Sequence, residues 1–147
     1  MHKKLPIGIF DSGFGGLSVT KSIHNLLPIE NLIYVADSAF TPYGDLPENE
    51  IVKRSILITE FLVRKKNSKA IVVACNTATA FSINELRKKF NIPIIGMEPA
   101  VKPALKVSLN NRVGVLATSG TSKSTKLSAL LENHLGKARF YVQPCPG

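Results

Sequence analysis

The sequence contains no tryptophan and little cysteine or histidine: its 147 residues include two cysteines and three histidines. Cys75 and Cys145 are far apart, which excludes a disulfide framework and a CxxC metal motif, and the histidines cluster with neither acids nor thiols. We therefore expect no metal. Long apolar runs are also absent, since none approaches the roughly 20 residues that cross a bilayer. Residues 1–6 lead straight into a predicted strand without the apolar core of a signal peptide, so we expect a cytoplasmic protein with no membrane contact.

Acidic residues are also scarce, because 10 Asp and Glu stand against 19 Lys and Arg and give a net charge of +9. A positive balance suits an anionic partner. The basic side chains, however, fall at expected helix surfaces and lack the interleaved aromatics of a platform for single-stranded nucleic acid. We predict no nucleic-acid partner and interpret the charge as a solvated face whose field attracts small acidic ligands. The basic residues at the expected helix surfaces are Lys53, Arg54, Arg64, Lys65, Lys66, Arg87, Lys88 and Lys89.

The pattern of apolar residues predicts an α/β fold. Short continuous apolar runs alternate with longer amphipathic runs, which is typical of a parallel sheet flanked by helices in βα repeats. In such sheets the active groups lie in loops beyond the carboxyl ends of the strands. The expected strands are 7–10, 32–36, 70–74, 94–96, 113–117 and 140–142. The expected helices are 17–27, 48–66, 79–90, 100–109 and 122–135.

One internal similarity bears on the domain organisation. Segment 7–13 resembles segment 113–120, since each is a strand that ends in a hydroxyl residue and a glycine before a helix. Chance produces such strand openings as readily as duplication does. If the similarity reflects duplication, the chain holds the first lobe of a two-lobed, pseudo-symmetric fold. Residues 1–98 then form a first lobe that carries Asp11 and Cys75, and residues 99–147 form the start of a second, truncated lobe.

Cys75 lies where a predicted strand passes into a helix. Free backbone N–H groups and the helix dipole stabilise a thiolate at such a position, so we expect the pKa of this thiol to fall below the usual value of about 8.5. The alternative is a small buried residue that closes a strand.

Three further segments follow predicted strands. The glycine-rich turn 11–17 lets main-chain N–H groups approach an anion, although Asp11 has the alternative role of a helix cap. The turn lacks the GxGxxG order of a dinucleotide site. Loop 37–45 presents a tyrosine and a glycine that either cover a small ligand or pack on the core. The hydroxyl-rich segment 118–125 either holds a carboxylate or caps a helix, and its lysine does not match the spacing of a P-loop.

An acid, a thiol and hydroxyls at one edge of the sheet suit proton abstraction by a thiolate. Hydrolysis would instead require a histidine that activates the thiol, and no histidine falls in a loop at a strand end. A thiol hydrolase is therefore the weaker alternative.

Four segments are similar, in the same order, to motifs of the glutamate racemases in the aspartate/glutamate racemase superfamily. They are residues 9–17, 42–44, 74–78 and 117–121, and the resemblance extends from Ile7 to Gly147. It implies the N-terminal portion of an isomerase that interconverts L- and D-glutamate without a cofactor and so supplies D-glutamate for peptidoglycan.

The resemblance also assigns roles to residues. Cys75 would be one of two acid/base thiols, assisted by Asp11. The family's second cysteine, followed by threonine and histidine, lies in its other half, and Cys145 does not match that pattern, so we expect these 147 residues alone not to complete turnover. The implied substrate-binding residues are Asp11, Ser12, Pro42, Tyr43, Gly44, Asn76, Thr77, Thr118 and Thr121.

Other functions remain open at this point. An aspartate- or hydantoin-type racemase fits the same superfamily, and a non-catalytic module for acidic ligands fits the positive charge. The expected partner is the small molecule glutamate, and the sequence leaves a homodimer open.

Overall fold

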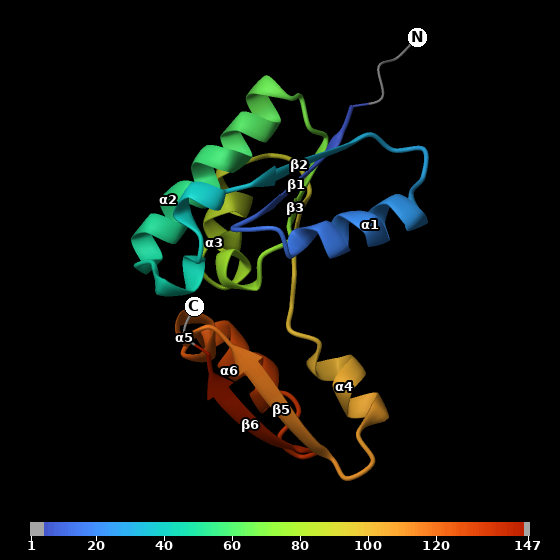
Figure 1. The fold of residues 1–147 in the computed structure, drawn as a ribbon, viewed down its shortest axis with the longest axis vertical. Helices are drawn as coiled ribbons and strands as arrows, with labels where there is room; N and C mark the ends of the chain where they lie inside the picture. Colours follow the sequence, from blue (N-terminus) through green and yellow to red (C-terminus); the bar gives the residue numbers. More distant parts are fainter. Residues whose placement is uncertain (1–4, 146–147) are drawn as a thin grey trace.

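The computed structural model describes residues 5–145, which form one four-stranded and one two-stranded parallel sheet (Figure 1). The start of the chain, for which we expect no signal peptide, and the last two residues of the racemase-like segment lie outside this range. In the described part, no helix combines the length and apolar character that crossing a membrane requires. The predicted α/β class with parallel sheets is confirmed.

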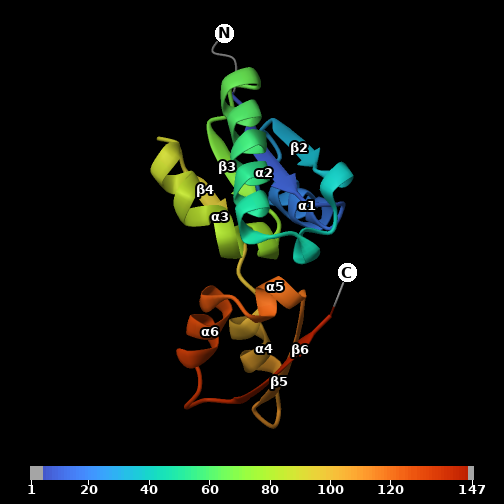
Figure 2. The ribbon, with the colours of Figure 1, turned by 90° about the vertical axis from the view of Figure 1, so that its left-hand side faces the viewer.

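The four-stranded sheet has the order β2-β1-β3-β4 with all strands parallel. Its strands are β1 (Ile7–Asp11), β2 (Leu32–Ala36), β3 (Ala70–Val73) and β4 (Ile94–Gly96). Every residue of β1 is buried, because helices cover both faces of the sheet. One face packs on α2 (Glu48–Glu60) and α3 (Asn76–Lys89), and the other on α1 (Gly16–Leu26), as Figures 1 and 2 show.

The two-stranded sheet pairs β5 (Arg112–Ala117) with β6 (Arg139–Pro144). A small core of Val113, Val115 and Leu127 lies beneath it, with side chains of α4 (Val101–Val107) and α6 (Thr125–Glu132) packed around it. We call the part from β1 to β4 the first lobe and the part from α4 to β6 the second lobe. The short helix α5 (Ser119–Ser122) brings the second lobe against α3 and the turn η2 (Tyr43–Asp45) of the first (Figure 2).

Most strands match their predicted positions, and α1 and α4 differ from their predicted ranges by one or two residues at each end. The other three predicted helices differ in where they begin or end or in their type of helix. Helix α3 begins at Asn76 rather than Thr79, because Cys75 is itself the N-cap and its Sγ accepts a hydrogen bond from the backbone N–H of Ala78. The helix expected over 122–135 is the shorter α6, Thr125–Glu132, because Ser124 caps α6 by accepting from the N–H of Leu127, and α5 is a separate helix that ends at Ser122.

The third difference concerns the helix expected over 48–66. Helix α2 ends at Glu60 and continues as the π-helical segment η3 (Phe61–Lys65), where Lys66 N–H donates to Phe61 O. Loop 37–45 contains two single turns, η1 (Ser38–Phe40) and η2. At the strand ends, β3 stops at Val73 rather than at residue 74, and β6 extends over 139–144 rather than 140–142.

Candidate active site

The carboxyl ends of β1 and β3 meet the start of α5 at a cavity of about 760 Å³. The first lobe contributes Asp11 and Cys75 to its lining, and the second lobe contributes residues of α4, of β5 and of the segment that follows β5. Six of the predicted site residues line this cavity: Asp11, Cys75, Asn76, Thr77, Thr118 and Thr121. Ser12 adjoins it through its contact with Cys75, whereas the lining does not include Pro42, Tyr43 or Gly44.

Cys75 is buried, with 8% of its surface exposed. Its Sγ lies 3.4 Å from the N–H of Ala78, which donates to it, and 3.6 Å from the hydroxyl of Ser12. Burial raises the pKa of the Cys75 thiol, the hydrogen bonds from Ala78 and Ser12 oppose this rise, and the nearby charge of Asp11 adds to it. The expected depression of this pKa is therefore wrong, because the loss of hydration outweighs the N–H groups at the helix start.

Asp11 is held in one orientation by backbone donors. Its Oδ1 accepts from the N–H of Ser12 at 2.7 Å and its Oδ2 from the N–H of Gly16, the first residue of α1, at 2.8 Å. A Cβ at Gly16 would lie 2.9 Å from both Ala74 Cβ and Asp11 Cβ, so only glycine permits this close approach. The carboxylate thus satisfies the start of α1 and still lines the cavity with Cys75.

Three threonine hydroxyls join the two lobes. Thr77, in the first turn of α3, places its Oγ1 3.2 Å from Thr118 Oγ1 and 3.0 Å from Thr121 Oγ1. Thr118 Oγ1 also donates to Thr121 Oγ1 and accepts from the N–H of Thr121, which makes Thr118 the cap of α5. Within segment 118–125 the helix caps are Thr118 and Ser124, rather than the expected Thr121 or Ser122. Thr118 and Thr121 also line the cavity.

Tyr43 packs into the core of the first lobe. It is 1% exposed, and its hydroxyl donates to Asp37 Oδ2 at 2.6 Å. Burial and the Asp37 carboxylate raise the pKa of Tyr43. The neighbouring Gly44 faces the second lobe, because a Cβ on it would lie 2.5 Å from Thr118 Cβ. Of the two interpretations of loop 37–45, the structure therefore shows the tyrosine packed on the core.

Asp37 and Arg54 form a largely buried ion pair that was not predicted from the sequence. Arg54 of α2 binds both carboxylate oxygens of Asp37, at 2.9 Å and 2.7 Å, and only 22% of its side chain is exposed. Its assignment to a solvated face is therefore wrong. Burial favours a higher pKa for Asp37, but hydrogen bonds from Arg54 and Tyr43 hold that pKa below its usual value. No local motif marks this pair, because its members are 17 positions apart.

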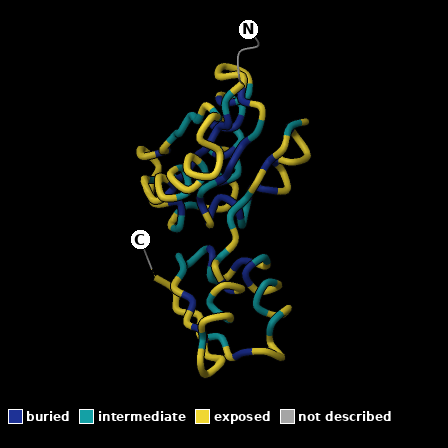
Figure 3. Tube along the Cα trace, turned by 90° about the vertical axis from the view of Figure 1, so that its right-hand side faces the viewer, coloured by how far each residue is buried: buried dark blue, intermediate teal, exposed yellow. Residues whose placement is uncertain are grey.

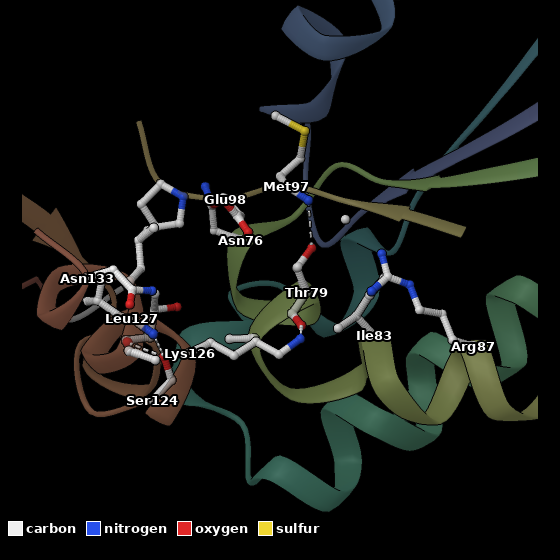
Figure 4. A pocket seen from close by; sticks show the side chains of 16 residues that line it. Asn76, Thr79, Ile83, Arg87, Met97, Glu98, Ser124, Lys126, Leu127 and Asn133 are labelled. Carbon is white, nitrogen blue, oxygen red and sulfur yellow. Dashed lines mark hydrogen bonds between the residues drawn. The ribbon is translucent and has the colours of Figure 1, made fainter. Parts of the chain in front are cut away.

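A second cavity of about 320 Å³ lies between α3 and α6 (Figure 4). Lys126 reaches from α6 to donate to the carbonyl of Thr79 at 3.2 Å, and the Thr79 hydroxyl accepts from the N–H of Met97 at 3.1 Å. Burial, together with the charge of Arg87, lowers the pKa of Lys126. The two lobes therefore contact each other around this cavity as well as at the threonine cluster.

Known proteins resemble this chain over nearly its whole length. The model of the family described as Asp/Glu/Hydantoin racemase matches residues 7–147. The glutamate racemase of Ectopseudomonas mendocina is 53% identical over 147 residues, which cover 99% of this chain and 56% of that protein. The glutamate racemase of Pseudomonas aeruginosa strain PAO1 is 49% identical over 142 residues, which cover 96% of this chain and 53% of that protein.

Solved structures give the same result. Escherichia coli glutamate racemase, in complex with L-glutamate and the activator UDP-MurNAc-ala, superposes with a TM-score of 0.87 at 38% identity, covering 95% of this chain and 53% of that one. Glutamate racemase from Aquifex pyrophilus gives 0.85 at 42% identity, covering 96% and 55%. The chain spans about half the length of these relatives, and its fold corresponds to a part of theirs. By sequence and by fold, the chain belongs to the Asp/Glu/hydantoin racemase family.

Proposed function

We propose that the complete protein containing this chain is a glutamate racemase, which interconverts L- and D-glutamate by proton transfer at Cα without a cofactor. The observation that carries the proposal is the position of Cys75, whose sulfur lies in the wall of a large cavity together with the carboxylate of Asp11. Family membership and the names of the relatives support it.

In this mechanism the Cys75 thiolate removes the Cα proton from one face of the substrate. The raised pKa of Cys75 makes its thiolate a stronger base, and the Asp11 carboxylate contributes to that rise. Racemisation also needs a proton donor on the opposite face of Cα. We assign that role to a second thiol outside residues 1–147, and we take residues 1–98 as the first lobe and residues 99–147 as the beginning of the second.

Substrate binding is proposed for polar groups around the same cavity. The hydroxyls of Thr77, Thr118 and Thr121 meet there, and Ser12 and Asn76 adjoin Cys75. Hydroxyl and backbone donors of this kind bind carboxylates and stabilise the negative charge that develops as the proton leaves. Two solved relatives, from Escherichia coli and Francisella tularensis, hold L- and D-glutamate respectively, which supports glutamate as the ligand. The product D-glutamate would serve peptidoglycan synthesis in the cytoplasm.

The test follows deuterium at Cα. The complete protein, incubated with L-glutamate in heavy water, should form D-glutamate deuterated at Cα, because the thiols exchange their protons with solvent. Cys75→Ser should lower this rate by about a thousandfold, since a general base contributes about 10²- to 10⁴-fold. The matched control is Cys145→Ser, which removes an exposed thiol that does not line the cavity and should leave the rate near that of the wild type.

Two results would contradict the proposal. One is the absence of deuterium at Cα with L-glutamate, which would favour a binding module, or an aspartate racemase if L-aspartate incubated in parallel is deuterated. The other is a Cys75→Ser variant as active as Cys145→Ser.

A further inference from the structure

Asp37 stands directly behind the proposed catalytic edge. It follows β2, and its backbone N–H donates to the carbonyl of Asp11 at 2.9 Å. Only 7% of Asp37 is exposed, so its carboxylate needs partners within the protein. The structure supplies them from two other elements.

The first partner is Arg54 of α2. Its Nε donates to Asp37 Oδ2 at 2.9 Å and its Nη2 to Asp37 Oδ1 at 2.7 Å, the two-pronged geometry that a guanidinium forms with a carboxylate. The same guanidinium lies 3.9 Å from the centre of the Phe40 ring. The Asp37 carboxylate and the Phe40 ring thus hold the Arg54 guanidinium in place, and the guanidinium orients the Asp37 carboxylate.

The second partner is Tyr43 of the turn η2, whose hydroxyl donates to Asp37 Oδ2 at 2.6 Å. We call Asp37, Tyr43 and Arg54 the Asp37 clamp. It ties the end of β2, the middle of α2 and the turn η2 together through one buried carboxylate. None of its three members lines the cavity that holds Cys75.

The turn η2, which the clamp holds, is one of the surfaces of the first lobe that contact the second lobe. Gly44 is so close to Thr118 that an added Cβ would lie 2.5 Å from Thr118 Cβ, and the carbonyl oxygen of Gly44 would lie 3.6 Å from a Cβ built on Gly120. Thr118 in turn contacts Thr77 at the cavity. A continuous chain of contacts therefore runs from Arg54 to the hydroxyls of the proposed substrate site.

We propose that Arg54 is a positioning residue: through Asp37 and Tyr43 it fixes the turn η2, and through that turn it sets how the segment from Thr118 to Thr121 closes on the cavity. Arg54 touches neither the cavity nor Cys75. The consequence for substrate binding rests on the proposed function, whereas the consequence for the turn and for α5 does not.

The chemistry of Arg54 determines which variants are informative. Loss of the guanidinium removes both N–H groups that donate to the buried Asp37 carboxylate, so the side chain of Asp37 must move or recruit water. Lysine keeps the positive charge but has no planar fork that binds both carboxylate oxygens. Arg54→Lys therefore separates charge from geometry, and Arg54→Ala removes both.

Two controls match these variants. Arg64→Ala removes an exposed arginine of η3, which directly follows α2. Arg64 forms a surface salt bridge with Glu60, four residues earlier, so this variant tests the loss of one positive charge. Ile51→Val trims a side chain of α2 that is 1% exposed, and so tests mild destabilisation of that helix. Neither residue lies in the clamp or in the cavity lining.

The first measurement is hydrogen exchange of the complete protein, read by mass spectrometry on peptides covering 42–46 and 118–122. Arg54→Ala and Arg54→Lys should exchange about tenfold faster than the wild type in both peptides, because both segments lose their support. Arg64→Ala and Ile51→Val should match the wild type in both. Unchanged exchange over 118–122 in Arg54→Ala overturns the proposal, whether or not the protein turns over glutamate.

The second measurement is steady-state kinetics with L-glutamate. Both Arg54 variants should raise KM about tenfold while kcat changes less than about threefold, which indicates lost binding geometry rather than lost chemistry. A wild-type KM in Arg54→Lys would show that charge alone suffices and would overturn the positioning role. A fall in thermal stability with KM unchanged would do the same. If the wild-type protein shows no racemisation, the proposed function fails, and the exchange data still decide on the clamp.

Discussion

The two lobes differ in how their cores are built, and the catalytic candidates divide between them accordingly. The first lobe has a cluster of thirteen buried residues on one face of its sheet and a further cluster on the other. The second lobe has three, and β5 alternates buried with exposed residues, whereas β1 is buried throughout. Figure 3 shows the same contrast along the chain. The thiol of Cys75 and the carboxylate of Asp11 thus lie in the lobe with the larger buried core, and the hydroxyls of Thr118 and Thr121 contact that lobe through Thr77.

The largest expected effect tests the two cores directly. Leu86, fully buried on α3 of the first lobe, should lower the free energy of unfolding by about 4 kcal/mol when changed to alanine, within the usual range of about 2–5. Leu127→Ala in the second lobe should cost about 2 kcal/mol, because its smaller cluster relaxes more easily into the space left. Denaturant unfolding measures both, and equal losses would remove the contrast between the lobes.

The next prediction concerns Asp11, the acidic residue that the first lobe contributes to the cavity. Asp11→Asn should lower kcat for glutamate racemisation by about a hundredfold, since the neutral amide no longer raises the basicity of Cys75. Glu85→Gln makes the same carboxylate-to-amide change at an exposed position outside the cavity and should leave kcat near the wild-type value. If both variants behave alike, Asp11 acts as a helix cap only.

A smaller effect is expected where the lobes touch. Gly44→Ala places a Cβ against Thr118 and should destabilise the complete protein by about 1–3 kcal/mol, the usual cost of overpacking. Gly136→Ala is the control, because nothing lies within 4 Å of its added Cβ among the described residues. A neutral Gly44→Ala would mean that the second lobe shifts freely on the turn η2, against the contact described above.

The smallest expected effect is a shift along the pH axis. In a Cys145→Ser background, alkylation of Cys75 by iodoacetamide should rise with pH, with a midpoint above the usual thiol value of about 8.5. The sign follows from the raised pKa, because the reactive thiolate appears only when pH exceeds that pKa. A midpoint below the usual value would show that the N–H groups of α3 outweigh burial, as the sequence alone suggested.

Local sequence patterns were sufficient for the four-stranded sheet and for the edge at which Asp11 and Cys75 lie together. The apolar runs at 7–10 and 70–74 are strands because both faces of their sheet are covered, and parallel strands then bring Asp11 and Cys75 to the same edge. Helix starts were less predictable. The periodicity of 79–90 does not show that Cys75 caps α3 with its sulfur, because cysteine is not among the usual capping residues.

The pKa of Cys75 and the Asp37 clamp could not be predicted from the sequence for a different reason. The ionisation of Cys75 depends on how much water the fold removes, which no neighbouring residue reveals. The clamp depends on Asp37 and Arg54, which are 17 positions apart, and the sequence around Arg54 does not distinguish it from a surface arginine of a helix. Both effects arise from packing between elements rather than within them.

One atom of this molecule has two tasks, with a consequence for inhibitors. The Cys75 sulfur that we assign to proton transfer also accepts the Ala78 amide and so caps α3. An electrophile that alkylates it converts a good acceptor into a bulky thioether and leaves that amide without its partner. Covalent inhibition at this position would therefore block proton transfer and also loosen the first turn of α3. Because Thr77 lies in that turn, its contacts with Thr118 and Thr121 of the second lobe would weaken as well.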